Sequence, residues 1–130
     1  GVNAEHVLEL DDELLPTGAT SAVADDADLR SAPFLGNRRL DTVYVGASSP
    51  ALLHTADIEL RLHFDAAIET VVVYVSPGAV CIEPWSAWPD AFRMAAAGHS
   101  SGAVVLEPGE PLKRWTRWEW SLGMDNGEAR

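Results

Sequence analysis

Two segments of this chain alternate strictly between apolar and polar residues, and this period of two constrains the fold more than any other feature. The segments are residues 58–64 and residues 116–122. Successive side chains of a strand point to opposite faces, so each segment predicts a strand with one buried and one solvated face. Trp118 and Trp120 share the apolar positions of the second segment, and we expect both to lie in the core.

Three denser apolar runs lie between these segments, at residues 71–75, 79–82 and 103–106. Such runs are typical of strands that are covered on both faces. The first two are separated by Ser76-Pro77-Gly78. Proline and glycine at the two central positions fit a type II turn, so the sequence predicts a tight hairpin here.

The remaining signals also favour short strands. Residues 2–10 and 42–45 each predict one, and the first ends at an acidic run followed by the turn residues Pro16-Thr17-Gly18. Only residues 89–97 predict a helix, of one or two turns, with Gly98 as its stop. Many short strands separated by glycine and proline turns indicate an all-β fold, an antiparallel β-sandwich.

Length and charge limit the class of protein. The chain has 130 residues, which suits one domain, and we expect residues 1–122 to form it and the polar tail 123–130 to fray. A formal net charge of −11 argues against nucleic acid as a partner, and Arg38-Arg39 is too small for a basic patch. No apolar run approaches the ~20 residues of a membrane span, and no signal-like start is present. The sequence therefore predicts no membrane partner and a cytoplasmic location.

Cys81 is the only cysteine of the chain, so no intrachain disulfide can form. It lies between Val80 and Ile82 in a strand-like run. We expect a buried, inert thiol.

A carboxylate and two tryptophans follow the same run. Glu83 precedes Pro84, which holds the backbone extended, and Trp85 and Trp88 come next. A carboxylate can take a proton from a sugar hydroxyl while an aromatic ring covers the C–H face of the sugar. The alternatives are a solvated carboxylate for Glu83 and packing roles for both tryptophans.

These motifs, in this order, resemble the C-terminal half of aldose 1-epimerases (galactose mutarotases). The resemblance runs from about His6 to Leu122. The segments that carry it are Val7 to Gly18 with its Leu-Pro-Thr-Gly turn, Asp28-Leu29-Arg30, Arg39-Leu40-Asp41-Thr42-Val43-Tyr44, Cys81-Ile82-Glu83-Pro84-Trp85 and Pro89-Asp90-Ala91-Phe92. It implies part of a galactose-mutarotase-like supersandwich, acting in carbohydrate metabolism as an isomerase.

The resemblance also implies roles for single residues. Glu83 would be the general base that takes the anomeric proton, and Asp41 would hydrogen-bond sugar hydroxyls, although without the family Asp41 reads as a turn or capping residue. Trp85 and Trp88 would bind the sugar by stacking or by lining the cleft. No metal or organic cofactor is implied.

This chain departs from the family in lacking the N-terminal half of the fold and the acid histidine that it carries. The acid that protonates the ring oxygen would be a histidine of an N-terminal half, and none of His6, His54, His63 and His99 matches it. We therefore expect a companion N-terminal chain or segment of the same fold. No arginine pair is clearly placed for a phosphate, so the sugar is left open.

Two other classes of function remain open at this point. A non-catalytic carbohydrate-binding module would keep the cleft and lack the acid. A pure interaction domain would use the tryptophans as core and leave Glu83 inert.

Overall fold

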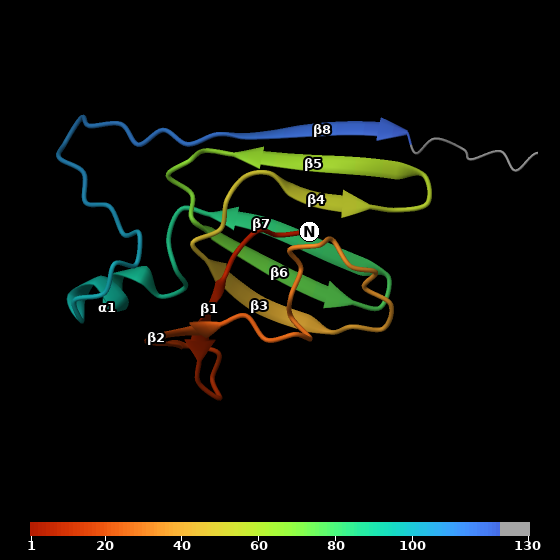
Figure 1. Ribbon diagram of the computed structural model, residues 1–130. Coiled ribbons are helices and arrows are strands. Elements are labelled where there is room, and N and C mark those ends of the chain that lie inside the picture. The colour runs from red at the N-terminus through yellow and green to blue at the C-terminus, as the bar shows by residue number, and fades with distance from the viewer. Residues whose placement is uncertain (123–130) are drawn as a thin grey trace, which may run out of the picture.

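The computed structural model describes residues 1–122 and consists of two antiparallel sheets that pack face to face (Figure 1). The predicted tail 123–130 lies outside the described residues. The strands are β1 (His6–Leu10), β2 (Pro16–Ala22), β3 (Leu40–Val45), β4 (Ala51–His54), β5 (Ile58–Phe64), β6 (Thr70–Ser76), β7 (Ala79–Trp85) and β8 (Thr116–Leu122). Within residues 1–122 the one α-helix is α1 (Ala91–Ala96). The all-β sandwich expected from the sequence is confirmed.

The larger sheet has the strand order β2-β1-β3-β6-β7, and the smaller sheet has the order β4-β5-β8. Every neighbouring pair is antiparallel. The hairpin predicted at Ser76-Pro77-Gly78 joins β6 to β7, where Ser76 pairs with Ala79 and Gly78 has a φ of 78°. That positive φ is the conformation that a type II turn needs from its glycine.

The two faces of the larger sheet have different environments. One face packs against the smaller sheet, and the core cluster between them includes Tyr44 and Val71 from the larger sheet and Leu62 and Phe64 from the smaller one. Burying a side chain of this size contributes roughly 1.5–3 kcal/mol. The opposite face carries a second apolar cluster of Leu8, Val43, Val45 and Val72. We call this opposite face the site face.

Several strand predictions are confirmed with small shifts of boundary. The alternating segments form β5 and β8 with the predicted bounds, and residues 71–75 lie in β6, where Val71 is fully buried. The predicted helix is the six-residue α1, and Gly98 follows its C-cap with a φ of 90°. Pro16-Thr17-Gly18, predicted as a turn, instead begins β2.

Three predictions of burial are wrong. Trp118 and Trp120 are 54% and 71% exposed, because among residues 1–122 β8 pairs with β5 alone and forms the outer edge of the smaller sheet. Residues 103–106 form no strand, and Val105 is 89% exposed. Cys81 is exposed, because its place in β7 turns it away from the core.

Candidate functional site

Strand β7 positions Glu83 on the site face. Pairing of β6 with both its neighbours places Val43, Val72 and Glu83 side by side in one row across three strands. The Glu83 side chain is half-buried. Because side chains alternate along a strand, Trp85 lies on the same face two residues further on. Its indole Nε1 donates a hydrogen bond to Glu83 Oε2 over 3.1 Å, so one carboxylate oxygen is held by the tryptophan.

Strand β3 positions Asp41 on the same face, one row away. Asp41 pairs with Tyr74, and Tyr74 pairs with Cys81. Asp41 is therefore two strands from Glu83, about 10 Å across the sheet and about 7 Å along it. Asp41, Tyr74 and Cys81 are all exposed. The surface between the two carboxylates therefore includes the exposed side chains of Tyr74 and Cys81.

Tyr74 is the residue of this face that the sequence did not single out. It is 43% exposed in the middle of β6, whereas the valines on either side of it are buried. The sequence signal is the single phenol in the run Val71 to Val75, a run whose apolar density predicts a strand covered on both faces. A hydroxyl between Asp41 and Cys81 adds a hydrogen-bonding group to the face.

Trp88 is packed more tightly than Trp85. Its side chain is half-buried against the apolar cluster of the site face, and its backbone N–H donates to the Ser101 carbonyl over 2.8 Å. It also lines a cavity of about 260 Å³ together with Thr70 and Ser101. The structure therefore places Trp88 at one end of the face as a cover for the cluster, while Trp85 contacts the carboxylate directly.

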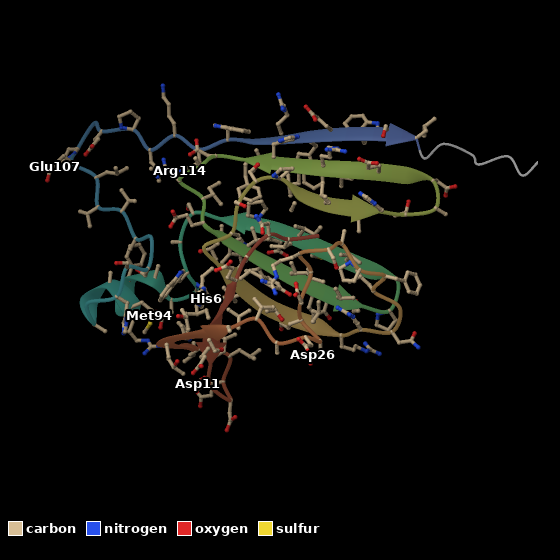
Figure 2. All side chains as sticks on the ribbon, in the orientation of Figure 1. His6, Asp11, Asp26, Met94, Glu107 and Arg114 are labelled. Atoms are coloured by element: carbon tan, nitrogen blue, oxygen red, sulfur yellow. The ribbon has the colours of Figure 1, made fainter. Side chains whose placement is uncertain are left out.

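The segment around α1 closes that end of the face. Met94 is the buried residue of the helix, and Figure 2 marks it near β1 and β2. The Arg93 guanidinium donates to the Pro16 carbonyl over 3.0 Å and also bonds the Asp90 carboxylate. These contacts tie the loop that follows β7 to the edge strand β2.

Asp28-Leu29-Arg30, one of the motifs of the family resemblance, lies in the loop between β2 and β3. The Arg30 guanidinium and backbone N–H bond the Asp28 carboxylate, and this lowers the pKa of Asp28 to about 2. Leu29 is buried in the core. Nearby, the Tyr44 hydroxyl donates to the Ala27 carbonyl over 2.5 Å, and burial raises the pKa of Tyr44 to about 12. The motif anchors a loop to the core.

The histidines lie apart from Glu83. His6, labelled in Figure 2, is on β1, three strands from β7 in the sheet order. His54 and His63 belong to the smaller sheet, where His63 Nε2 is 3.0 Å from Glu119 Oε2. His99 lies against Gly18. The structure therefore brings together Glu83, Asp41 and Trp85 on one face without a histidine beside the glutamate.

Residues 1–122 were also compared with the requirements of a metal site and of a membrane-spanning helix. In that range, the histidine, cysteine and carboxylate side chains form no group of three that could hold a metal ion. The same residues include no helix with the length and apolar character needed to cross a bilayer.

The fold and the face together define a β-sandwich with two carboxylates and an indole on an open sheet surface. The sequence model of the aldose 1-epimerase family matches residues 1–119. The chain therefore belongs to the aldose 1-epimerase family. Membership supports an isomerase of the sugar epimerase or mutarotase type and a sugar substrate.

Proposed function

We propose that the protein interconverts the α and β anomers of an aldose, with Glu83 as the general base. Glu83 takes the proton of the anomeric hydroxyl, an acid gives a proton to the ring oxygen, and the bond between C1 and the ring oxygen breaks. Rotation about C1–C2 and ring closure on the other face of C1 then give the second anomer. No atom is lost or gained. The observation that carries this proposal is the half-buried Glu83 carboxylate, held by the Trp85 indole on the face that also carries Asp41.

Asp41 and Trp85 have binding roles in this proposal. Asp41 is exposed, and its carboxylate oxygens can accept hydrogen bonds from sugar hydroxyls. Trp85 holds the base, and its exposed ring offers a surface for the sugar's C–H face. Trp88 supports the end of the site through its packing.

The acid of the proposed reaction comes from outside the described face. No histidine among residues 1–122 lies beside Glu83, and the site face is open to water around Asp41 and Tyr74. We assign the acid to an N-terminal half of the same fold, on this polypeptide or on a companion chain. The exposed apolar side of β8 supports this assignment, because Trp118, Trp120 and Leu122 offer a surface for further β-structure.

The test is the Glu83→Gln substitution, which keeps size and hydrogen-bonding atoms but removes the base. A general base contributes roughly 10²–10⁴-fold, so we expect kcat/KM for anomer exchange to fall by at least about 100-fold. The measurement is magnetisation transfer between the two anomers by NMR, on the protein assembled with its N-terminal half. Glu107→Gln, on an exposed loop, is the matched control. Equal activity of Glu83→Gln and this control would show that the base is another group.

A carbohydrate-binding module without catalysis is the second candidate, favoured by the absence of a histidine beside Glu83. It predicts saturable aldose binding that weakens in Asp41→Asn, with no acceleration of anomer exchange by any assembled form. A cytoplasmic location and the absence of nucleic-acid and membrane partners remain predictions from charge and composition.

A further inference from the structure

A cavity adjoins Glu83 on the side that faces away from Asp41. It is the cavity of about 260 Å³ to which Trp88 and Thr70 contribute, and we call it the Thr70 cavity. Its walls come from the end of β3, the start of β6 and the segment that follows β7, which meet at the end of the larger sheet nearest α1 (Figure 1). The volume is much larger than the single hydroxyl of an ordinary aldose needs.

The register of the larger sheet places this cavity beside the proposed base. Thr70 pairs with Val45 and with Trp85, and this row lies two residues along the strands from the row that holds Glu83. A step of two residues keeps the same face, so Thr70 belongs to the site face, about 5 Å across and about 7 Å along the sheet from Glu83. The row of Asp41 lies at the same spacing on the other side. Glu83 is therefore flanked by Asp41 on one side and by the Thr70 cavity on the other.

The hydroxyl of Thr70 is an unused hydrogen-bonding group of this cavity. Thr70 is only 4% exposed, yet its hydroxyl forms no hydrogen bond with another residue among residues 1–122. No side-chain oxygen in that range is both sealed from solvent and without a partner, so this hydroxyl opens to solvent, and Thr70 lines the cavity. Ser101, the other buried hydroxyl of the lining, instead donates to the Ala91 carbonyl over 2.7 Å. A nearly buried hydroxyl that is left without a protein partner indicates a partner from outside.

The rest of the lining suits an uncharged group that is polar at one end and apolar at the other. Trp88 contributes its indole, which packs on the apolar cluster of the site face. Glu69 contributes an exposed carboxylate, which accepts hydrogen bonds from N–H groups and disfavours an anionic ligand. A secondary amide with a methyl group matches this set, because its carbonyl accepts from Thr70, its N–H donates to a carboxylate and its methyl contacts an aromatic ring.

We propose that the Thr70 cavity binds the acetamido group of a 2-acetamido aldose, so that the substrate class of this protein is an N-acetylated amino sugar. Anomer exchange needs a free hydroxyl on C1, so a substituent that reaches beyond Glu83 has to come from a neighbouring carbon. C2 is bonded to C1 and carries the acetamido group in such sugars. The inference rests on the proposed function for the position of the sugar ring. The cavity and its unpaired hydroxyl do not depend on that function.

The experiment measures dissociation constants by isothermal titration calorimetry on the protein assembled with its N-terminal half. The ligands are glucose, N-acetylglucosamine, glucosamine and phenyl glucoside. We expect N-acetylglucosamine to bind at least about tenfold more tightly than glucose, because the amide adds hydrogen bonds and the methyl adds buried apolar area.

Two variants test the cavity, each with a matched control. Thr70→Val keeps the shape of the buried side chain and removes the hydroxyl, so the ratio of the two affinities should fall by roughly two- to tenfold. Ala67→Phe fills the cavity from an exposed position and should bring the ratio close to one. Thr20→Val, exposed on β2, and Ala66→Phe, outside the lining, should leave the ratio unchanged. Unfolding temperatures of the variants show that each one is folded.

The outcomes separate this inference from the function on which it rests. Equal affinities for glucose and N-acetylglucosamine, or no saturable binding of N-acetylglucosamine, would overturn the inference and leave the proposed function to its own test, the anomer exchange of glucose. Tighter binding of glucosamine than of N-acetylglucosamine would also overturn it, in favour of an ammonium site, and tighter binding of phenyl glucoside would do so in favour of a C1 substituent. If Ala67→Phe removes the advantage of N-acetylglucosamine while Glu83→Gln leaves anomer exchange unchanged, the cavity is assigned correctly and the base is not.

Discussion

Asp28 shows how a single carboxylate couples folding to pH. Its pKa is lowered from 3.8 to about 2, mainly by the side-chain hydrogen bond from Arg30 and then by the Arg30 backbone N–H. A carboxylate whose folded pKa is depressed stabilises the folded state above its unfolded pKa, and that contribution is lost as the pH falls through the folded value. The pH window is therefore from about 4 down to about 2.

We expect Asp28→Asn to destabilise the protein at pH 7, and the difference from the unsubstituted protein to shrink below pH 4 and vanish near pH 2. Urea unfolding at a series of pH values measures this. Because the Asp28 side chain is partly exposed, solvent screening keeps the difference small. Asp12→Asn, in an exposed loop, is the control for removing one negative charge. A difference that stayed constant down to pH 2 would show that the pair makes no pH-dependent contribution.

The residues of the site show what the sequence can and cannot predict at this scale. The sequence predicted Glu83 at the end of a strand over residues 79–82, whereas β7 continues to Trp85, and alternation along it puts Glu83 and Trp85 on one face. The hydrogen bond between them depends on side-chain rotamers, and the alternation of apolar and polar residues in a sequence does not predict rotamers. Arg38-Arg39 is too small for a basic patch, and its position beside the turn between β6 and β7 follows only from the fold.

At the scale of elements, strand prediction worked where the pattern reflects burial. β5 and β8 were predicted from alternation, and β6 from its continuous valines. β4 was missed because Ala51–His54 is too short to show a period, and β2 because its proline, threonine and glycine are typical of turns. Residues 103–106 have the composition of a strand but find no neighbouring strand among the described residues to pair with.

Gly18 is a residue of β2, and His99 of the segment that follows α1 packs against it. Its φ is 91°, and a Cβ placed there would lie 2.3 Å from Nε2 of His99. We expect Gly18→Ala to destabilise the protein by about 1–2 kcal/mol from the left-handed backbone alone, with an additional cost from displacing the imidazole. Gly78→Ala is the matched control, because its φ is 78° and nothing lies within 4 Å of its Cβ position.

Chemical denaturation of the two glycine variants, and of Gly18→Ala combined with His99→Ala, measures the two contributions. In a double-mutant cycle, the steric part should disappear when His99 is truncated, and the backbone part should remain. Equal losses for Gly18→Ala and Gly78→Ala would mean that His99 moves aside without cost, and that it does not fix the loop to β2.

At the scale of the whole molecule, the predicted burial of Trp118 and Trp120 was wrong for an informative reason. The alternation in β8 is real, and Trp118 does line the small cavity between the sheets with Leu62 and Val80. β8 is the outer strand of the smaller sheet, so no strand of the larger sheet covers its apolar side within residues 1–122. Alternation predicts one apolar face for a strand, but it does not show which other segment, if any, covers that face.

The last prediction tests whether further β-structure covers β8. If the companion half packs there, Trp120→Glu places a charge in the contact and should weaken association by about 2 kcal/mol or more, which is roughly 30-fold. Ser121→Glu is the control, because the adjacent residue of the strand points to the opposite face and is also exposed.

Native mass spectrometry of the purified protein, mixed with its N-terminal half, measures the complex against the free 14.0 kDa chain. A free chain that dominates equally for both variants, or a species of twice the chain's mass that survives Trp120→Glu, would show that this apolar surface serves no such contact. The acid of the reaction would then have to come from another surface.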